Sequence, residues 1–329
     1  MFPYVIRRVS LMIFMLLLLS VVTFLLFNAV PTNPAALTCG KTCTPQVIHA
    51  NEIRLGLDKP IYIQYLDWFK GIFVGRTYGS GSQTFDCNAP CLGYSFRQQA
   101  EVTGLILKAL PVTLYLSLGA FIMWMVGGIS SGIYAAKHKG SWQDRTIMGI
   151  TLVGYSMPVF FIGLFLLLFV IVRAHLLPYP DYISPLENPL QFFQTMILPW
   201  TALAILYAAY YTRLTRSQML ETMSEDYIRT ARAKGLSERV VVRKHAFRAG
   251  LTPIVTSAGM DLAGLLGGAV ITEYIFSLPG LGRLAIGAVH DYDLAVITGT
   301  TLIAATFIIV ANIVVDLLYA AIDPRVRLT

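Results

Sequence analysis

The sequence predicts an all-α membrane protein with six transmembrane helices and a small extracytoplasmic domain between helices 1 and 2. Of its 329 residues, 56% are hydrophobic and only 13% are charged, which is more apolar material than one soluble core needs. Six apolar runs resemble segments that cross a hydrocarbon core of about 30 Å. The basic residues also gather in the segments that would lie on one side of the membrane.

The first run, residues 9–29, follows Arg7 and Arg8. A signal peptide has a similar basic start, but this apolar core is too long and no small-residue cleavage site follows closely. We therefore expect residues 1–29 to be the N-terminus and a retained first helix. The other runs are residues 111–136, 147–172, 196–211, 254–275 and 294–321. Pro158 and Pro199 are expected to bend or break the third and fourth helices.

The charge distribution sets the predicted orientation. With an inside N-terminus, segments 1–8, 137–146, 212–253 and 322–329 face the cytoplasm and hold 16 of the 25 Lys and Arg residues. This is the asymmetry of the positive-inside rule, so both termini are expected to be cytoplasmic. The net charge of +7 then reflects topology, and we expect membrane lipid and no nucleic acid as a partner.

Residues 30–110 are expected to form the extracytoplasmic domain, and residues 111–329 the five-helix core. The domain holds all four cysteines of the chain: Cys39, Cys43, Cys87 and Cys91. An even number of cysteines on the oxidising side favours structural disulfides, with three pairings open. Zinc binding by the two CxxxC pairs and redox chemistry are the alternatives.

No catalytic motif is present. The sequence lacks HExxH and GxSxG, and Gly40-Lys41-Thr42 has Ala35 where a P-loop needs its first glycine. We expect no catalytic residue, no metal site and no nucleotide bound by this chain. A membrane-embedded enzyme is disfavoured because the spans lack paired catalytic residues, and an ion-driven carrier or channel is a further alternative.

Ionisable residues within spans are functional candidates because a charge in hydrocarbon costs roughly 2.5–3.5 kcal/mol on insertion scales. Asp261 is the deepest, about nine residues into the fifth run, and either lines a polar pathway, pairs with a partner subunit or serves a structural role. Glu273 lies near the end of that run, where it could reach the interface. Pro279 and Gly280 follow as an outer gate, a re-entrant loop or a plain turn. Glycines in the same run favour close helix packing over a hinge: Gly259, Gly264, Gly267 and Gly268.

The longest basic segment is residues 224–253, within the predicted cytoplasmic loop 212–253. Ser224 is expected to cap a short helix that Gly235 ends. Tyr227, Ile228, Ala231 and Lys234 share one face of it. A second basic helix at 238–248 should lead to Pro253. The alternative is a solvated loop that only sets topology.

This segment resembles the coupling loop of permease subunits of bacterial ATP-binding cassette importers. Their EAA-x₃-G motif matches Arg229, Thr230, Ala231 and Gly235, with Arg in place of Glu. The form DYIRTARAKGLSERVVVRKHAFRAGLTPIVT is similar to the dipeptide, oligopeptide and nickel permease subfamily. Further pieces resemble the same subfamily: residues 55–60 with Gln64, Tyr65 and Trp68, then residues 273–282 and 323–327. The insertion around Cys87 and Cys91 is not part of the usual pattern.

The resemblance implies a multi-pass subunit of the bacterial inner membrane that forms a pathway with a second, homologous permease subunit. Its partners would be two ATP-binding cassette ATPase subunits or domains, which bind ATP and Mg, and an extracytoplasmic substrate-binding protein. The substrate would be a di- or oligopeptide, with nickel or another small solute as the alternative. The implied ATPase-coupling residues are Tyr227, Ile228, Arg229, Thr230, Ala231, Arg232, Lys234 and Gly235. Among these, the cationic residues would pair with acidic groups, and Tyr227 and Ile228 would be the apolar anchor.

Overall fold

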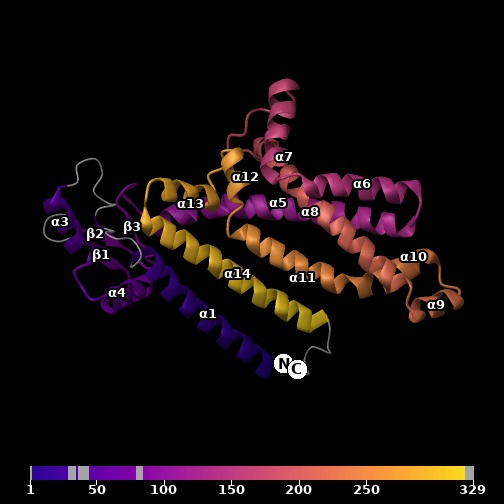
Figure 1. Cartoon of the computed structure of the whole chain (residues 1–329), viewed down its shortest axis with the longest axis horizontal. Helices are drawn as coiled ribbons and strands as arrows, with labels where there is room; N and C mark the ends of the chain where they lie inside the picture. Colours follow the sequence, from indigo (N-terminus) through magenta and orange to yellow (C-terminus); the bar gives the residue numbers. More distant parts are fainter. Residues whose placement is uncertain (1, 29–34, 36–43, 79–83, 323–329) are drawn as a thin grey trace. The chain divides into compact units, whose positions relative to one another are not determined.

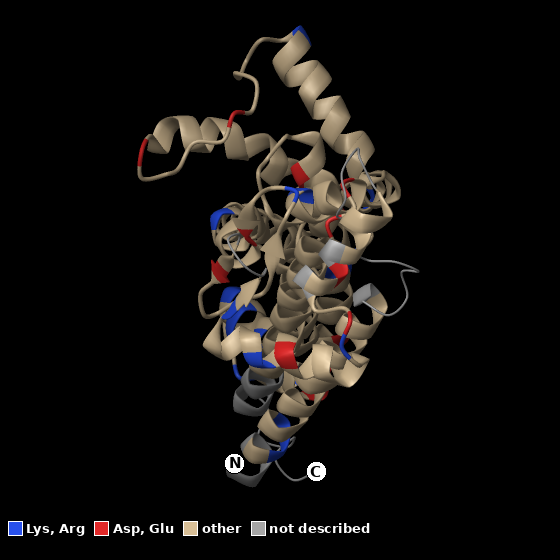
Figure 2. Cartoon of the chain, turned by 90° about the vertical axis from the view of Figure 1, so that its left-hand side faces the viewer, with Lys and Arg blue, Asp and Glu red and all other residues tan. Residues whose placement is uncertain are grey.

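The computed structural model describes residues 2–28, 35, 44–78 and 84–322, and these are mostly helical (Figure 1). Charged residues are sparse along the helices, so most of the ribbon in Figure 2 is neutral. Five helices of the described part are long and apolar enough to cross a membrane, and one bent pair makes a sixth candidate. Cys39, Cys43 and residues 323–327 lie outside the described residues.

The chain divides into two compact units that interleave along the sequence. The first comprises Met1–Thr113, Leu266–Val270 and Pro279–Ile313. The second comprises Leu114–Leu265, Ile271–Leu278 and Val314–Thr329. Each unit is described by itself below.

In the first unit, helix α1 (Phe2–Asn28) packs against α4 (Ile61–Val74). The contact is aromatic, because the Phe24 ring lies 5.5 Å from that of Tyr65 and 5.6 Å from that of Trp68, measured between centroids. A hydrogen bond of 2.8 Å between the Ser20 and Tyr65 hydroxyls adds to it. The aromatic residues of the predicted domain therefore hold it to the first span.

Four short strands depart from the predicted all-α fold. Strands β1 (Arg76–Tyr78) and β2 (Phe85–Cys87) form one antiparallel pair, and β3 (Tyr94–Ser95) and β4 (Ala100–Glu101) form another. Cys87, the last residue of β2, forms a disulfide with Cys91, so a structural disulfide is present as expected and belongs to one of the three pairings that the sequence left open. Aromatic rings then fill the space between the hairpins: Tyr78, Phe85, Tyr94 and Phe96. Helix α3 (Pro45–Leu55) precedes these strands, with Thr44 as its N-cap.

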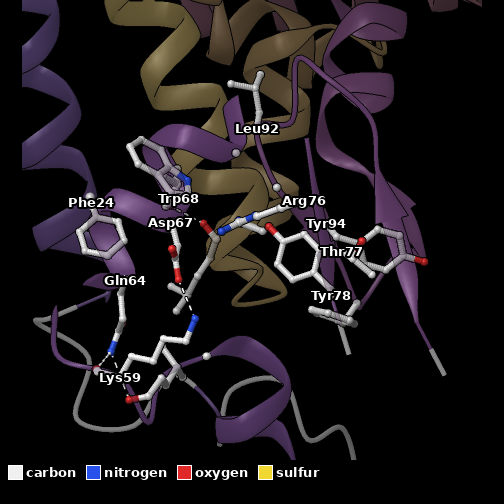
Figure 3. A pocket seen from close by; sticks show the side chains of 18 of the residues that line it. Phe24, Lys59, Gln64, Asp67, Trp68, Arg76, Thr77, Tyr78, Leu92 and Tyr94 are labelled. Carbon is white, nitrogen blue, oxygen red and sulfur yellow. Dashed lines mark hydrogen bonds and ion pairs between the residues drawn. The ribbon is translucent and has the colours of Figure 1, made fainter. Parts of the chain in front are cut away.

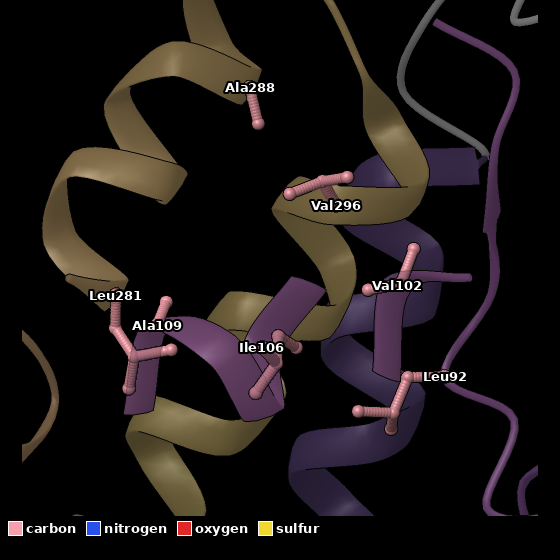
Figure 4. Packing of buried hydrophobic residues seen from close by; sticks show 7 residues of the cluster. All are labelled: Leu92, Val102, Ile106, Ala109, Leu281, Ala288 and Val296. Atoms are coloured by element: carbon pink, nitrogen blue, oxygen red, sulfur yellow. The ribbon is translucent and has the colours of Figure 1, made fainter. Parts of the chain in front are cut away.

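The core of the first unit lies where α5 (Val102–Lys137) begins, beside α13 (Leu281–His290) and α14 (Leu294–Ile322). Seven buried residues meet there, as Figure 4 shows: Leu92, Val102, Ile106, Ala109, Leu281, Ala288 and Val296. The Leu281 N–H donates to Thr113 Oγ1 at 2.8 Å, which fixes the start of α13 on α5.

In the second unit, the third predicted span is bent by 99° between α6 (Trp142–Ser156) and the helix that starts at α7 (Val159–Leu166). The bend falls at Pro158, as expected from the sequence. Met157 is extended, with ψ of 128°, because a residue before proline is excluded from helical geometry by the ring. The segment continues as a π-helical stretch, Leu167–Arg173, so the predicted run 147–172 is a candidate span in two bent pieces.

Helix α8 (Pro189–Met223) is longer than the predicted run at 196–211. It begins at Asn188, whose side chain accepts a hydrogen bond from the Gln191 N–H at 3.2 Å. It passes through Pro199 without ending, so the break considered at Pro199 does not occur. Its polar last turns were missed because a hydropathy criterion stops at the first arginine, Arg213.

Glycines bring α5 and α8 into close contact within the second unit. A Cβ on Gly128 would lie 2.7 Å from Tyr211 Cβ, and one on Gly132 would lie 2.6 Å from Thr215 Cβ. Gly128 and Gly132 are four residues apart and so share a helix face, in the small-xxx-small pattern that lets helix backbones approach.

The fifth predicted span is also interrupted. Helix α11 (Phe247–Leu266) ends before Gly268, whose φ of 121° is outside the helical region, and α12 (Val270–Ile275) follows. A Cβ on Gly268 would lie 3.0 Å from the Gly282 backbone. Gly264 has open space around its Cβ position, so it makes no close packing contact among the described residues.

We predict that Gly132→Ala destabilises the chain by about 1–3 kcal/mol, since the added methyl would collide with the α8 backbone as well as Thr215. Gly127→Ala is the matched control, because its Cβ would lie 4.0 Å from the nearest atom, a normal contact. Thermal unfolding in detergent measures both. Equal melting temperatures for the two variants would contradict the packing described here.

Candidate functional site

The basic segment predicted as a coupling loop folds as a helical hairpin at the end of α8. Helix α9 (Asp226–Ala233) is followed by a turn and then by α10 (Glu238–Val240) and a π-helical stretch, Val241–Ala246, that runs directly into α11. The second basic helix is therefore present, but it does not stop near residue 248. Pro253 lies inside α11.

Ser224 does not cap α9, contrary to the prediction. It has helical φ and ψ and closes α8, with its hydroxyl donating to the Glu221 carbonyl at 2.7 Å. Glu225 occupies the N-cap position without a side-chain cap bond. Asp226 in the first turn is the acid that the positive end of the helix dipole favours.

Gly235 ends the helix as the sequence indicates. Its φ is 76°, in the left-handed region that glycine adopts at little cost. Its N–H donates to the Arg232 carbonyl at 2.9 Å, and the Leu236 N–H donates to the Ala231 carbonyl at 3.4 Å. These two bonds form a Schellman motif, which fixes the direction in which the chain leaves α9.

The inner face of α9 packs on its own chain. Ile228 is fully buried and Ala231 is 6% exposed. They join a cluster with residues of α5, α8 and the π-helical stretch: Ala136, Met219, Val241, Val242 and Ala246. Ile228 is thus not available as an apolar anchor for a partner, which corrects that expectation. Of the four residues predicted to share one face, Ile228 and Ala231 are buried, whereas Tyr227 and Lys234 are exposed.

The outer face of α9 is polar and exposed, and it carries Arg229, Thr230, Lys234 and a 46% exposed Tyr227. Arg229 lies 3.4 Å from Asp226 in the same helix. Arg232 is already paired, since its guanidinium donates to both Glu238 oxygens at 3.1 and 2.8 Å. This bond raises the pKa of the Arg232 guanidinium and links α9 to α10.

A buried ion pair that sequence reasoning missed lies beside this hairpin. Arg216 on α8 donates from Nε and Nη2 to the two oxygens of Asp144 on α6, at 2.6 and 2.8 Å. The Gly140 N–H donates to the same carboxylate at 3.0 Å, so the side chain of Asp144, 5% exposed, is well compensated. One sequence signal was available: Asp144 is the single acid in the basic segment 137–146.

Asp261 lies on a cavity of about 520 Å³ in the second unit. Its Oδ2 accepts a hydrogen bond from the Tyr211 hydroxyl at 2.6 Å. The cavity opens at the bend between α6 and α7 and is lined by Tyr155, Ser156, Met157, Pro158, Val159, Leu206, Tyr207, Tyr210 and Asp261. The structure therefore brings together Asp261 and Pro158, which the sequence marked for separate reasons.

The predicted gate residues have unlike environments. Glu273 in α12 is fully buried, which corrects the expectation that it reaches an interface. Its carbonyl accepts from the Leu278 N–H at 2.9 Å, so the chain turns tightly there. Gly280 is the N-cap of α13 and follows Pro279. These residues belong to different units, Glu273 to the second and Pro279 with Gly280 to the first.

Two family models match the chain over most of its length. Residues 128–328 match "Binding-protein-dependent transport system inner membrane component". Residues 1–117 match the N-terminal component of the same kind of membrane protein. The chain belongs to this family of transport permeases. It is thus a membrane transport subunit, in agreement with the resemblance drawn from residues 226–256.

Relatives and solved structures agree with this assignment. The dipeptide transport system permease protein DppB of Escherichia coli K12 is 36% identical over 351 aligned residues, covering 99% of each chain. A Brucella abortus protein named as a peptide transport system permease is 38% identical over 98% of each chain. A structure of the MetNI methionine ABC transporter, inward facing, has a TM-score of 0.53 at 18% identity over 67% of this chain and 97% of that one. The last supports the fold alone.

We predict that Ile228→Ala lowers the free energy of unfolding by about 2–4 kcal/mol, because it leaves a cavity under α9. Tyr227→Ala, at the exposed neighbouring position, should change it by less than about 0.5 kcal/mol. Denaturant or thermal unfolding in detergent measures both variants. A larger loss for Tyr227→Ala than for Ile228→Ala would show that the two faces of α9 are assigned the wrong way round.

Proposed function

We propose that this chain is one of two homologous permease subunits of an ATP-driven importer of di- or oligopeptides. The strongest support for this proposal is the 36% sequence identity to a dipeptide permease over 99% of both chains. The Brucella relative, named for peptide transport, supports the same substrate class. The chain would lie in a bacterial inner membrane with both termini in the cytoplasm, as the distribution of basic residues indicates.

The α9 hairpin is the proposed contact with the ATPase. Its outer face offers Tyr227 as the apolar anchor, with Arg229 and Lys234 as cations for acidic groups on the partner. Ile228 and Ala231 instead tie α9 to α8 and α5. Because packed elements move together, a displacement of α9 would be passed to the membrane helices. ATP and Mg would be bound by the ATPase subunits, so this chain would contribute motion and no catalysis.

The cavity at Asp261 is the proposed pathway wall. A peptide is polar along its backbone, and tyrosine hydroxyls and one carboxylate offer it hydrogen bonds beside apolar ring surface. The second permease subunit would complete the pathway, and a substrate-binding protein would deliver peptide to the outer side. Glu273, Pro279 and Gly280 are proposed as gate residues.

Gly235 tests the coupling role. Gly235→Val should disrupt the end of α9, because a β-branched residue is strained at a φ of 76°, while Gly235→Asn should preserve it, since asparagine tolerates this conformation. No atom lies within 4 Å of the Cβ position, so only the backbone is affected. In proteoliposomes, an importer that contains Gly235→Val should still hydrolyse ATP, but it should take up several-fold less peptide per ATP hydrolysed. Equal coupling in both variants would argue against this role.

Tyr211 tests the pathway. Tyr211→Phe removes the donor to Asp261, a hydrogen bond of about 1 kcal/mol, and should slow uptake of a labelled dipeptide by about fivefold. Tyr210→Phe is the matched control, since Tyr210 lines the same cavity but is not the residue that donates to Asp261. Identical uptake by the two variants would contradict a role for the Tyr211–Asp261 hydrogen bond in the pathway.

The same wild-type proteoliposomes test the substrate. Labelled dipeptide should accumulate only with the binding protein and ATP present. Accumulation of nickel, with no peptide uptake, would replace the substrate while leaving the permease assignment intact.

A further inference from the structure

A second cavity, of about 550 Å³, lies wholly within the first unit and is not used by the mechanism above. Its walls come from the end of α1, the turn between α3 and α4, strand β1 and the start of α14. Figure 3 shows Trp68, Arg76, Lys59 and Asp67 among the residues that line the same space. Several wall residues belong to the 55–60 segment that resembles the subfamily's external domain.

Arg76 is held rigidly on this wall. Its side chain lies across Gly71 of α4, where a Cβ would come within 3.0 Å of the arginine Cδ. Its guanidinium carbon lies 4.2 Å above the centre of the Tyr78 ring, a cation–π contact. Gly71 therefore makes room for the arginine, and Tyr78 sets the orientation of its guanidinium.

The guanidinium of Arg76 has unmet hydrogen-bonding capacity. Its Nε is buried without a hydrogen-bond partner, and none of the ion pairs found among the described residues includes it. Burial lowers the pKa of Arg76 to about 10, with the charge of Asp67 acting in the opposite direction. The group thus remains a cation at neutral pH. A buried polar group without a partner is costly, so a ligand that satisfies it is favoured.

Three of the neighbouring charged residues on the wall already have partners. Lys59 Nζ lies 2.7 Å from Asp67 Oδ2. Asp67, the acidic residue of α4, is therefore already paired with Lys59. Asp293, at the start of α14, accepts a hydrogen bond from the Ser95 hydroxyl and another from the Val296 N–H. Arg76 is therefore left to bind an anion that enters the cavity.

We propose that this cavity binds a short peptide by its C-terminal carboxylate, with Arg76 as the anion-binding residue. The inference rests on the proposed peptide substrate. The planar guanidinium fork suits a carboxylate, and the volume falls within the roughly 300–1,000 Å³ of small-ligand sites. The remaining wall mixes aromatic rings with charges of both signs, which suits a zwitterionic peptide better than the acyl chains of a lipid: Trp68, Tyr78, Tyr94, Phe96, Asp58 and Lys70.

Trp68 provides a local readout because it lines this cavity. The purified importer is titrated with L-alanyl-L-alanine and, separately, with its C-terminal amide, while tryptophan emission is recorded. The wild type should respond to the acid and bind the amide about 10- to 100-fold more weakly, as expected for loss of a charged hydrogen-bond partner. A Trp68→Phe variant should lose the response, which assigns the signal to this cavity.

Arg76→Gln should weaken binding of the acid by a similar factor, and Arg76→Lys should restore part of it. Lys108→Gln is the matched control, because it removes an equal charge from an exposed position of the same unit that does not line this cavity. Equal binding of acid and amide, or wild-type binding by Arg76→Gln, would overturn the proposal. The proposal would also be overturned if phosphatidylglycerol in nanodiscs, or inorganic phosphate, saturated the tryptophan signal and L-alanyl-L-alanine displaced neither of them.

ATP-driven uptake by the wild-type importer separates this inference from the proposed function. Dipeptide uptake together with no carboxylate-dependent response at Trp68 would overturn the Arg76 site alone. An absence of peptide uptake would instead overturn the proposed substrate, and with it the peptide identity of the Arg76 ligand.

Discussion

The close approach of α8 to α5 is the contact on which the second unit depends. Gly128 and Gly132 bring the two helix backbones together, and no larger side chain fits at those positions. Along α8, Tyr211 then reaches Asp261, Arg216 reaches Asp144, and Met219 packs under α9. The contacts to the cavity, to the buried ion pair and to the exposed hairpin thus follow one another along a single helix, α8. The hairpin and the cavity are therefore connected by one continuous helix.

Local chemistry in the sequence identified several features of this arrangement. Apolar runs located the candidate spans because hydrocarbon tolerates few charges, but the ends of several spans shifted and the third and fifth runs are each interrupted. Gly235 was found as a helix end because its left-handed backbone is a property of the residue itself. Pro158 was found for a similar reason, since the ring restricts Met157 wherever the segment lies. The segment 226–256 also identified the family, which the full-length comparisons confirm.

Features that depend on distant partners could not be found in this way. Ser224 was expected to cap α9, but it is the C-cap of α8, and Glu225 occupies the N-cap position of α9. Ile228 was expected to face a partner, but Met219 and Val242 cover it. Pro199 was expected to bend or break its helix, and α8 continues through it without a break. The strands around the Cys87–Cys91 disulfide escaped notice because they are only two or three residues long.

The length of α8 has a consequence for how a partner approaches. Its apolar part ends near Tyr211, and residues 212–223 extend the same helix by about 18 Å at 1.5 Å per residue. The proposed docking face of α9 is therefore carried on about three turns of helix beyond the apolar part of α8. A partner bound at α9 would thus contact the chain through a polar helical extension of α8 and not through its apolar segment.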